Sequence, residues 1–150
     1  MTDLSKIKLR PATAEDAEFG FETLRQALGD YIESTWGWDE DFQRQQFSRR
    51  WASGLQKIIT LGEQDIGALS VDRRPDCIKF NSIYIRPEFQ NQGIGTHLVQ
   101  ELIREAAAAQ KPIRLRVLKV NPVISLYLRL GFCTTSETEN HFVMEYVTVE

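Results

Sequence analysis

The chain is poor in cysteine and contains no long apolar run. Its two cysteines, Cys77 and Cys133, lack the spacing of metal ligands, so we expect no metal site and two free thiols, as in a reducing cytoplasm. No apolar stretch approaches the roughly 20 residues of a membrane span. The first residues also lack the apolar core of a signal peptide. These absences predict a cytoplasmic protein with no membrane partner.

An excess of positive charge is also missing. The 18 lysines and arginines are outnumbered by 21 aspartates and glutamates, giving a net charge of −3, whereas a general nucleic-acid binder needs a basic face. A hydrophobic content of 42% and a charged content of 26% are typical of a globular protein. Because 150 residues are the size of one ordinary domain and no repeat or linker interrupts them, we expect one domain over residues 1–150.

Hydrophobic periodicity and turn residues predict seven strands and several helices. The predicted strands are Ile7–Arg10, Gln56–Leu61, Ile66–Arg73, Ile78–Arg86, Ile113–Val120, Phe132–Glu137 and Phe142–Val149. The predicted helices run from a Thr13–Asp16 capping box to Gly29, over Tyr31–Trp36 and Asp39–Ser53 with a break near Gly37, from Ile94 to Gln110, and over Ser125–Leu130. This order indicates an α/β or α+β fold with a mixed sheet rather than an all-parallel one.

The most informative stretch is residues 80–97, in which a strand reaches Pro87, a short polar loop follows, and Gly93 and Gly95 open a helix. Such a strand–loop–helix unit leaves free backbone N–H groups and the positive end of the helix dipole at one point. That arrangement is typical of a phosphate site. The stretch therefore predicts a phosphate-bearing cofactor.

The glycine pair taken alone also fits a simple turn with close helix packing. A P-loop is excluded because no Gly-Lys-Ser or Gly-Lys-Thr follows. A dinucleotide-binding unit needs a third glycine and an acidic residue at the end of the next strand, and Ile113–Val117 contains no acid. A nucleotide-binding domain is thus the less favoured alternative.

Two motifs lie on either side of the strand predicted at residues 113–120. The first is Gln-x-x-Gly-x-Gly at residues 90–95, after a strand and Arg-Pro-Glu at 86–88. The second is Asn…Tyr-x-x-x-Gly-Phe at residues 121–132. Both resemble motifs of the GNAT superfamily of acyl-CoA-dependent N-acetyltransferases. The resemblance extends from about Ile7 to Val149. It implies a mixed, mostly antiparallel sheet of about seven strands, flanked by four helices and splayed at the central parallel pair.

The resemblance also implies acetyl-CoA, and hence coenzyme A, as the co-substrate. Backbone amides of the loop and helix start would hold the pyrophosphate, and the preceding strand would pair with the pantetheine amides. The residues implied to bind the cofactor are Ile83, Tyr84, Ile85, Gln90, Asn91, Gln92, Gly93, Ile94, Gly95, Thr96, Asn121 and Tyr127. Gly93 and Gly95 would let the backbone approach where a Cβ would intrude. Many family members carry arginine where this chain has Gln90, so binding would rest on backbone dipoles, with Arg86 or Lys119 as additional charges.

Tyr127 matches the tyrosine to which the family gives the role of general acid. A thiol has a pKa of about 8.5 and a tyrosine about 10, so a nearby hydroxyl can protonate the departing thiolate. A tyrosine at helical spacing also fits a core position. Asn121 matches a residue near the pantetheine and equally fits a helix cap before Pro122. Because neither cysteine has a motif partner, we expect direct attack without a covalent thiol intermediate.

The general base and the acceptor site are less well defined. Family members often carry a glutamate on the strand before the phosphate loop, where this chain has Asn81 and Ser82. Candidate bases are Glu33, Glu137 and His141, and a relayed base is an equal alternative. The stretch Tyr31–Glu40 combines aromatic and acidic residues that suit a cationic amine or, alternatively, core packing. Candidate acceptor-binding residues are Tyr31, Glu33, Trp36 and His141.

The sequence thus predicts a transfer of acetyl from acetyl-CoA to a primary amine of a small molecule or peptide. The alternative is a non-catalytic acyl-CoA-binding sensor or regulatory module with the same fold, which the missing strand carboxylate favours. A homodimer is a further expectation, because dimers are common in the family.

Overall fold

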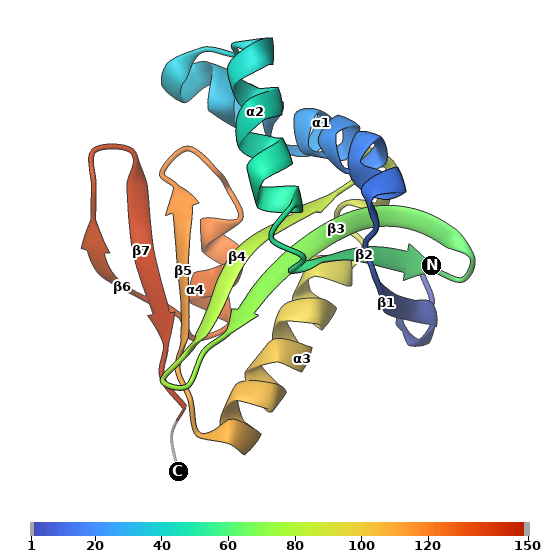
Figure 1. Cartoon of the computed structure of the whole chain (residues 1–150). Coiled ribbons are helices and arrows are strands. Elements are labelled where there is room, and N and C mark those ends of the chain that lie inside the picture. The colour runs from blue at the N-terminus through green and yellow to red at the C-terminus, as the bar shows by residue number, and fades with distance from the viewer. Residues whose placement is uncertain (1, 149–150) are drawn as a thin grey trace. The chain divides into compact units, whose positions relative to one another are not determined.

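The computed structural model describes residues 2–148 and contains a mixed sheet with four α-helices (Figure 1). The strands are β1 (Ile7–Pro11), β2 (Gln56–Leu61), β3 (Gln64–Arg73), β4 (Ile78–Ile85), β5 (Ile113–Leu118), β6 (Cys133–Glu137) and β7 (His141–Tyr146). The helices are α1 (Ala17–Trp36), α2 (Glu40–Trp51), α3 (Ile94–Ala109) and α4 (Ile124–Arg129), with short 3-10 turns η1 (Leu4–Lys6), η2 (Ala14–Asp16) and η3 (Pro87–Phe89).

The seven strands follow the order β1-β2-β3-β4-β5-β7-β6. The pairs β1–β2, β2–β3, β5–β7 and β6–β7 are antiparallel, whereas β4 and β5 are parallel, from Ile78 opposite Ile113 to Phe80 opposite Leu115. This arrangement confirms the expected mixed, mostly antiparallel sheet with four helices.

The chain forms two compact units. Unit 1 comprises residues up to 70 together with 82–95, and unit 2 comprises 71–81 together with the residues from 96 onward. Strands β3 and β4 contribute residues to both units. Residues within each unit contact one another more than they contact residues of the other unit.

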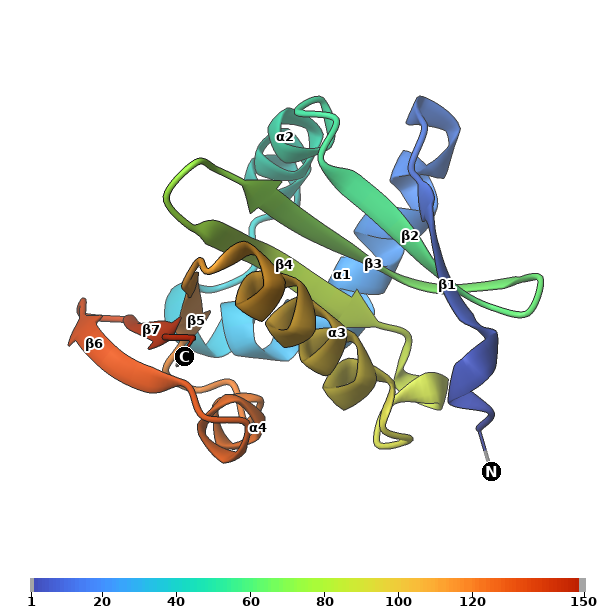
Figure 2. The same cartoon turned by 90° about the horizontal axis from the view of Figure 1, so that it is seen from below.

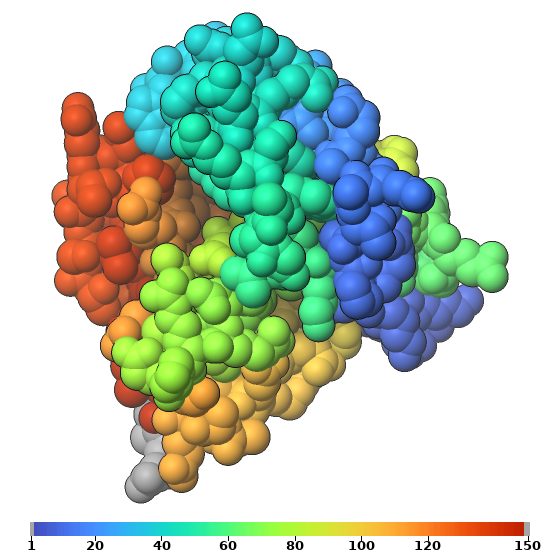
Figure 3. All heavy atoms as spheres, in the orientation of Figure 1, coloured from blue at the N-terminus to red at the C-terminus, as the bar shows by residue number. Residues whose placement is uncertain are grey.

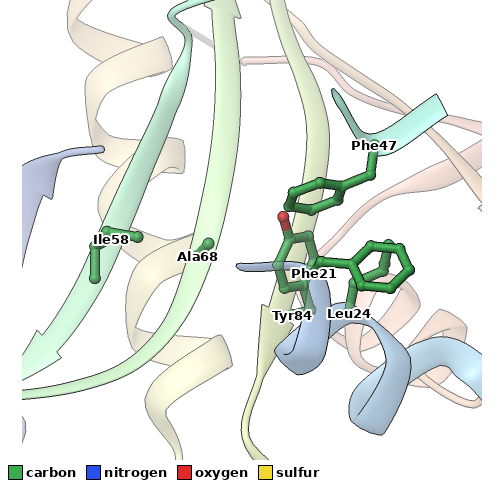
Figure 4. Packing of buried hydrophobic residues seen from close by; sticks show 6 residues of the cluster. All are labelled: Phe21, Leu24, Phe47, Ile58, Ala68 and Tyr84. Carbon is green, nitrogen blue, oxygen red and sulfur yellow. The ribbon is translucent and has the colours of Figure 1, made fainter. Parts of the chain in front are cut away.

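In unit 1, α1 and α2 cover one face of β2 and β3. Figure 2 shows β1, β2 and β3 side by side with both helices on the far face, and the space-filling view shows α1 and α2 packed directly against each other (Figure 3). The buried cluster between helices and strands consists of Phe21, Leu24, Phe47, Ile58, Ala68 and Tyr84 (Figure 4). Helical spacing on α1 and alternation on the strands bring these apolar side chains to one layer.

The first helix is longer than its sequence predicts. The predicted end at Gly29 is wrong, because α1 continues to Trp36 and ends at Gly37, whose φ is +82°. One glycine inside a helix costs only about 1 kcal/mol relative to alanine. Burial of Ile32, which is 8% exposed, offsets that cost. Predicted helicity over 31–36 is therefore correct, but as part of α1.

Unit 2 is built on β5, β6 and β7, with α3 and α4 in the same unit. Strand β5 ends at Leu118 rather than at the predicted Val120, because the Asn121 amide donates to the Leu118 carbonyl at 3.0 Å and closes a turn there. Strand β7 begins one residue before the predicted Phe142 and ends at Tyr146. The predicted strand end at Val149 lies outside the described residues.

Within residues 2–148, no helix combines the length and apolar character needed to cross a bilayer. Over the same residues, no group of three or more His, Cys, Asp or Glu side chains is arranged to hold a metal ion. Both cysteines are free thiols, Cys77 buried and Cys133 exposed.

Candidate functional site

The predicted cofactor residues from 83 to 95 lie in unit 1, at the end of β4, in the following loop and at the first residues of α3. The Arg86 amide donates to the Ile66 carbonyl at 2.8 Å, which ties the end of β4 to β3. The 3-10 turn η3 then uses the amides of Phe89 and Gln90, which donate to the Arg86 and Pro87 carbonyls at 2.9 and 3.2 Å. The amide of Gln90 is thereby occupied, so the backbone donors for an anion begin further along the loop.

Two glutamine side chains hold the loop in shape. Gln90 Nε2 donates to the Ile85 carbonyl at 2.8 Å, and Gln92 Nε2 donates to the Glu88 carbonyl at 3.0 Å. The Thr2 hydroxyl donates to the Oε1 atom of Gln92. Both glutamines were predicted from the motif as cofactor contacts. In the structure their side chains bind backbone carbonyls of the same segment.

Gly93 is required by the backbone conformation. Its φ is +82°, and Asn91 also has a positive φ of 61°, which is a costly conformation for residues with a Cβ. A Cβ on Gly93 would meet only Leu4 Cδ1, at 3.9 Å, among the described residues. The turn therefore needs glycine for its φ, while the predicted close approach to a ligand stays a prediction.

The helix start after this turn is where the sequence predicts the anion-binding groups. Helix α3 begins at Ile94, which is 1% exposed. The amides of its first turn, at Ile94, Gly95 and Thr96, have no acceptor within the helix, and the helix dipole places partial positive charge there. Over its 16 residues, α3 is long enough for this end to attract a phosphate.

The two cations proposed to assist the loop are both paired. Arg86 Nη2 lies 2.8 Å from Glu88 Oε2, with its guanidinium 5.9 Å from the centre of the Phe89 ring. Lys119 Nζ, in unit 2, lies 3.1 Å from Glu137 Oε1. Their charges are thus balanced within the chain, and the backbone dipoles carry the anion-binding character of the loop.

In unit 2, the Tyr-x-x-x-Gly-Phe motif forms the C-terminal cap of α4. The Phe132 amide donates to the Tyr127 carbonyl at 2.9 Å, and the Gly131 amide donates to the Leu128 carbonyl at 3.1 Å. These two bonds define a Schellman motif, with Gly131 in the left-handed position at φ +104°. The spacing of the motif therefore has a structural cause, and it sets the orientation of the turn that carries Tyr127.

Tyr127 is buried, with 5% of its surface exposed. Its ring lies edge-on to Phe80, with centroids 6.4 Å apart, and 5.4 Å from the Phe132 ring. Burial raises the pKa of the Tyr127 hydroxyl above its ordinary value, because the phenolate would lose its hydration. The hydroxyl is therefore protonated at neutral pH and has a proton to donate.

Asn121 forms the turn before α4. Its Oδ1 accepts a hydrogen bond from the Val123 amide at 3.0 Å, which closes a turn across Pro122. The N-cap of α4 is Val123, which makes no side-chain cap, so the interpretation of Asn121 as the helix cap is wrong. The second interpretation, a contact with pantetheine, stays a prediction.

The candidate bases in unit 2 have different surroundings. Glu137 Oε1 lies 3.1 Å from Lys119 Nζ, in an ion pair. Burial lowers the pKa of the His141 imidazole, and the nearby charge of Arg116 lowers this pKa further. The His141 ring is therefore neutral at neutral pH and can accept a proton.

The aromatic stretch at the end of α1 is partly a packing feature. The Trp38 amide donates to Glu33 Oε2 at 2.7 Å, and Trp38 Nε1 donates to Glu40 Oε1 at 2.9 Å. The Trp38 ring packs 6.1 Å from the Phe21 ring. The core-packing interpretation is confirmed for Trp38, whereas Trp36 is 56% exposed.

Two arginines next to this stretch, Arg25 and Arg44, were not predicted from the sequence. Arg25 Nη2 and Arg44 Nε lie 2.6 and 3.0 Å from Glu40 Oε2, and both guanidinium groups lie over the Phe21 ring, at 5.3 and 4.3 Å. The i,i+4 spacing of Glu40 and Arg44 was a usable signal, but no local pattern indicates Arg25. The chain's own cations thus contact these acids and aromatic faces, and the assignment of Tyr31 and Trp36 to the acceptor site stays a prediction.

The strand order, the parallel β4–β5 pair and the glycine turn before α3 define an α+β protein with a mixed sheet. A sequence profile described as "Acetyltransferase (GNAT) domain" matches residues 55–134. This match includes β3, β4, the loop, α3, β5 and α4, and the chain belongs to the GNAT acetyltransferase family. No curated protein sequence matches the chain.

Solved structures share the fold over nearly the whole chain. The PaiA N-acetyltransferase of Thermoplasma acidophilum in complex with coenzyme A has a TM-score of 0.75 at 19% identity, over 94% of this chain and 98% of that one. The ribosomal-protein-S18-alanine N-acetyltransferase of Escherichia coli has a TM-score of 0.70 at 18% identity, over 96% of both chains. A GNAT family acetyltransferase of Elizabethkingia anophelis with acetyl-CoA bound has a TM-score of 0.67 at 17% identity, over 95% and 98%.

Proposed function

We propose that this protein transfers an acetyl group from acetyl-CoA to a primary amine of a small molecule or peptide, with Tyr127 as the general acid. Membership of the family supports acetyl transfer, and two similar folds hold coenzyme A or acetyl-CoA. The observation that carries the proposal is Tyr127, a buried, protonated tyrosine that the Gly131–Phe132 cap holds on α4.

The proposed cofactor contacts follow the local structure. The amides of the first turn of α3 and of the loop from Gln92 onward bind the pyrophosphate, because they have no acceptor within the helix. The backbone groups of Ile83–Ile85 pair with the pantetheine amides as an added strand would. Asn121, in the turn before α4, is the further contact that we propose for the pantetheine.

The reaction is a direct attack. The amine nitrogen attacks the thioester carbonyl carbon, the C–S bond breaks, and the departing thiolate takes the proton of the Tyr127 hydroxyl. The amine loses its proton to a base, for which the neutral His141 imidazole is a candidate and a water relay is an alternative. Proton exchange with solvent then restores the Tyr127 hydroxyl. A free thiol has a pKa of about 8.5, so its thiolate is a weak base. Partial donation of the Tyr127 proton to the sulfur while the C–S bond breaks is therefore sufficient.

Replacing Tyr127 by phenylalanine tests the proposal, since the ring and its packing remain while the proton donor is lost. We expect kcat to fall by about 100-fold or more, in line with the usual contribution of general acid catalysis, while the Kd for coenzyme A changes by less than about threefold. Release of coenzyme A with a panel of amines measures kcat, and titration calorimetry measures Kd.

The matched control is Tyr146→Phe. Tyr146 lies 5.5 Å from the Phe132 ring in the same aromatic cluster, and we assign it no part in catalysis. We expect its kcat to stay within about twofold of wild type. Equal activity of wild type and Tyr127→Phe with any amine contradicts the role of Tyr127.

One observation favours the alternative of a non-catalytic acyl-CoA sensor. The middle of β4 offers Asn81 and Ser82 and no carboxylate, so a direct base on that strand is lacking. The sensor alternative predicts that coenzyme A binds to the wild-type protein while no amine increases its release. The same amine panel therefore separates the two functions.

A further inference from the structure

Gly67 lies in the middle of β3, buried, where a Cβ has no room. A Cβ built on Gly67 would lie 2.4 Å from the Tyr84 carbonyl oxygen and 3.1 Å from Ile85 Cα. Both neighbours are backbone atoms of β4, so no side chain can rotate away. A strand glycine of this kind marks a close approach of another backbone. The last residues of β4, the neighbour of β3 in the sheet, therefore approach β3 most closely at its one residue without a side chain.

A bulge in β3 lies directly beside this glycine. Ile59 of β2 is opposite Gly67, but the next residue, Thr60, is opposite Asp65. Ile66 is thus an extra residue on β3 without a partner on β2. Bulges bend a strand and re-aim the groups next to it, so the direction of β3 changes where the end of β4 lies beside it.

The end of β4 is held from both sides at this point. The Arg86 amide donates to the carbonyl of the bulged Ile66 at 2.8 Å. The Tyr84 side chain, 5% exposed, enters the core beneath the two N-terminal helices, and its hydroxyl points toward Phe47 (Figure 4). Its carbonyl lies over Gly67. Two features thus fix the position of the backbone of 83–85. They are the buried Tyr84 side chain and the room that Gly67 leaves for the Tyr84 carbonyl.

We propose that Gly67 is a positioning residue for the cofactor: the missing Cβ sets the direction of the Ile83–Ile85 backbone groups that receive the pantetheine amides. The inference rests on the proposed function, because it assigns those groups to coenzyme A. Gly67 itself touches no substrate. Its effect passes through the Tyr84 carbonyl.

The variant Gly67→Ala tests this role. Since Cβ contacts below 3.0 Å essentially never occur, the Tyr84 carbonyl must move by about 0.6 Å or more, and shifts of about 1 Å are costly at binding sites. The Tyr84 side chain cannot follow, because the core holds it, so the backbone of 83–85 turns. Hydrogen bonds weaken steeply when they are misaligned. We expect the Kd for coenzyme A to rise by about tenfold or more.

The specific readout is a second ligand that lacks pantetheine. Adenosine 3′,5′-bisphosphate has the nucleotide part of coenzyme A, so we expect its Kd to change by less than about threefold in Gly67→Ala. A merely structural defect would weaken both ligands together. The matched control is Gly29→Ala, whose added Cβ would have only ordinary contacts, 3.7 Å to Arg25 and 3.9 Å to Trp38, and we expect wild-type affinity for both ligands.

The outcomes separate the two proposals. If wild type binds coenzyme A and Gly67→Ala binds it equally well, or loses both ligands in parallel, the role of Gly67 is wrong. If wild type binds neither ligand, the proposed function fails. Should Gly67→Ala not fold, pantetheine titration of the wild type, followed by amide NMR, gives a second test: we expect shifts at Ile83–Ile85 and at Gly67, and an unchanged Gly67 amide contradicts the proposal.

Discussion

At the scale of single residues, Arg10 joins three segments of unit 1. Its guanidinium donates two hydrogen bonds of 2.9 Å to the Asp16 carboxylate and one of 3.0 Å to Asp65. Strand β1, the turn that opens α1, and the β2–β3 hairpin thus meet at one cation. The hydrogen bonds from Arg10 are the main reason that the pKa of Asp16 falls to about 2, and the Thr13 amide also donates to this carboxylate, at 2.9 Å.

We predict that Asp16→Asn lowers the free energy of unfolding at pH 7 by about 1 kcal/mol, a modest value because Arg10 is 39% exposed and solvent screens the pair. The depressed pKa means that the carboxylate stabilises the fold above its unfolded pKa of about 4 and ceases to do so as pH falls toward about 2. Urea unfolding at pH 7 and pH 3 measures both effects, and the difference between the two proteins should shrink at the lower pH. Asp76→Asn, at a carboxylate that is 76% exposed, is the control and should cost less than about 0.5 kcal/mol.

Residue identities at the loop were predictable, but their contacts were not. The motif nominated Gln90 and Gln92 for the cofactor, whereas their side-chain amides bind the Ile85 and Glu88 carbonyls. Glu33 was a candidate base, and it caps the Trp38 amide. Local spacing reveals which residues share a loop, while the carbonyl that a side chain reaches depends on the folded course of the backbone.

At the scale of elements, the cap of α4 converts a sequence motif into a position for Tyr127. Gly131 occupies the left-handed position, and a Cβ there would also lie 3.1 Å from Tyr146 Cε2. We predict that Gly131→Ala lowers the free energy of unfolding by about 2 kcal/mol, as the sum of backbone strain and a crowded ring.

The control for that prediction is Gly54→Ala. Gly54 has a similar φ of +78° but no atom within 4 Å of an added Cβ, so it isolates the backbone term, which we expect to be about 1 kcal/mol. Thermal or urea unfolding of both variants gives the difference. Equal losses in the two variants contradict the contribution of the Tyr146 ring.

Element types and order were predictable because the periodicities are strong, as on β2, whose predicted bounds match the structure. The end of α1 was not, since burial of Ile32 outweighs the low helix propensity of Gly29. The bulge at Ile66 also escaped prediction. A register shift depends on which residues of β2 pair with which residues of β3. The sequence of β3 alone shows a glycine at 67 but does not show this pairing.

At the scale of the whole molecule, each unit buries a tyrosine whose hydroxyl is protonated at neutral pH. Tyr84 lies in the core of unit 1 and Tyr127 in that of unit 2, each 5% exposed. Burial raises the pKa of both hydroxyls above their ordinary values, because neither phenolate would be hydrated inside the fold. Both tyrosines therefore link stability to alkaline pH.

We predict that the protein loses stability above about pH 10, where unfolded tyrosine ionises. Above that pH the unfolded chain binds fewer protons than the native one, so the free energy of unfolding falls as pH rises, by about 1.4 kcal/mol per pH unit for each buried tyrosine. Urea unfolding between pH 8 and pH 11 measures the slope, and tyrosinate absorbance reports ionisation on unfolding. Tyr84→Phe and Tyr127→Phe should each lower that slope by the contribution of one tyrosine, about 1.4 kcal/mol per pH unit. The double variant should lower it by the sum of the two contributions. A slope unchanged in both single variants contradicts the assignment, because the alkaline loss would then come from groups other than these two hydroxyls.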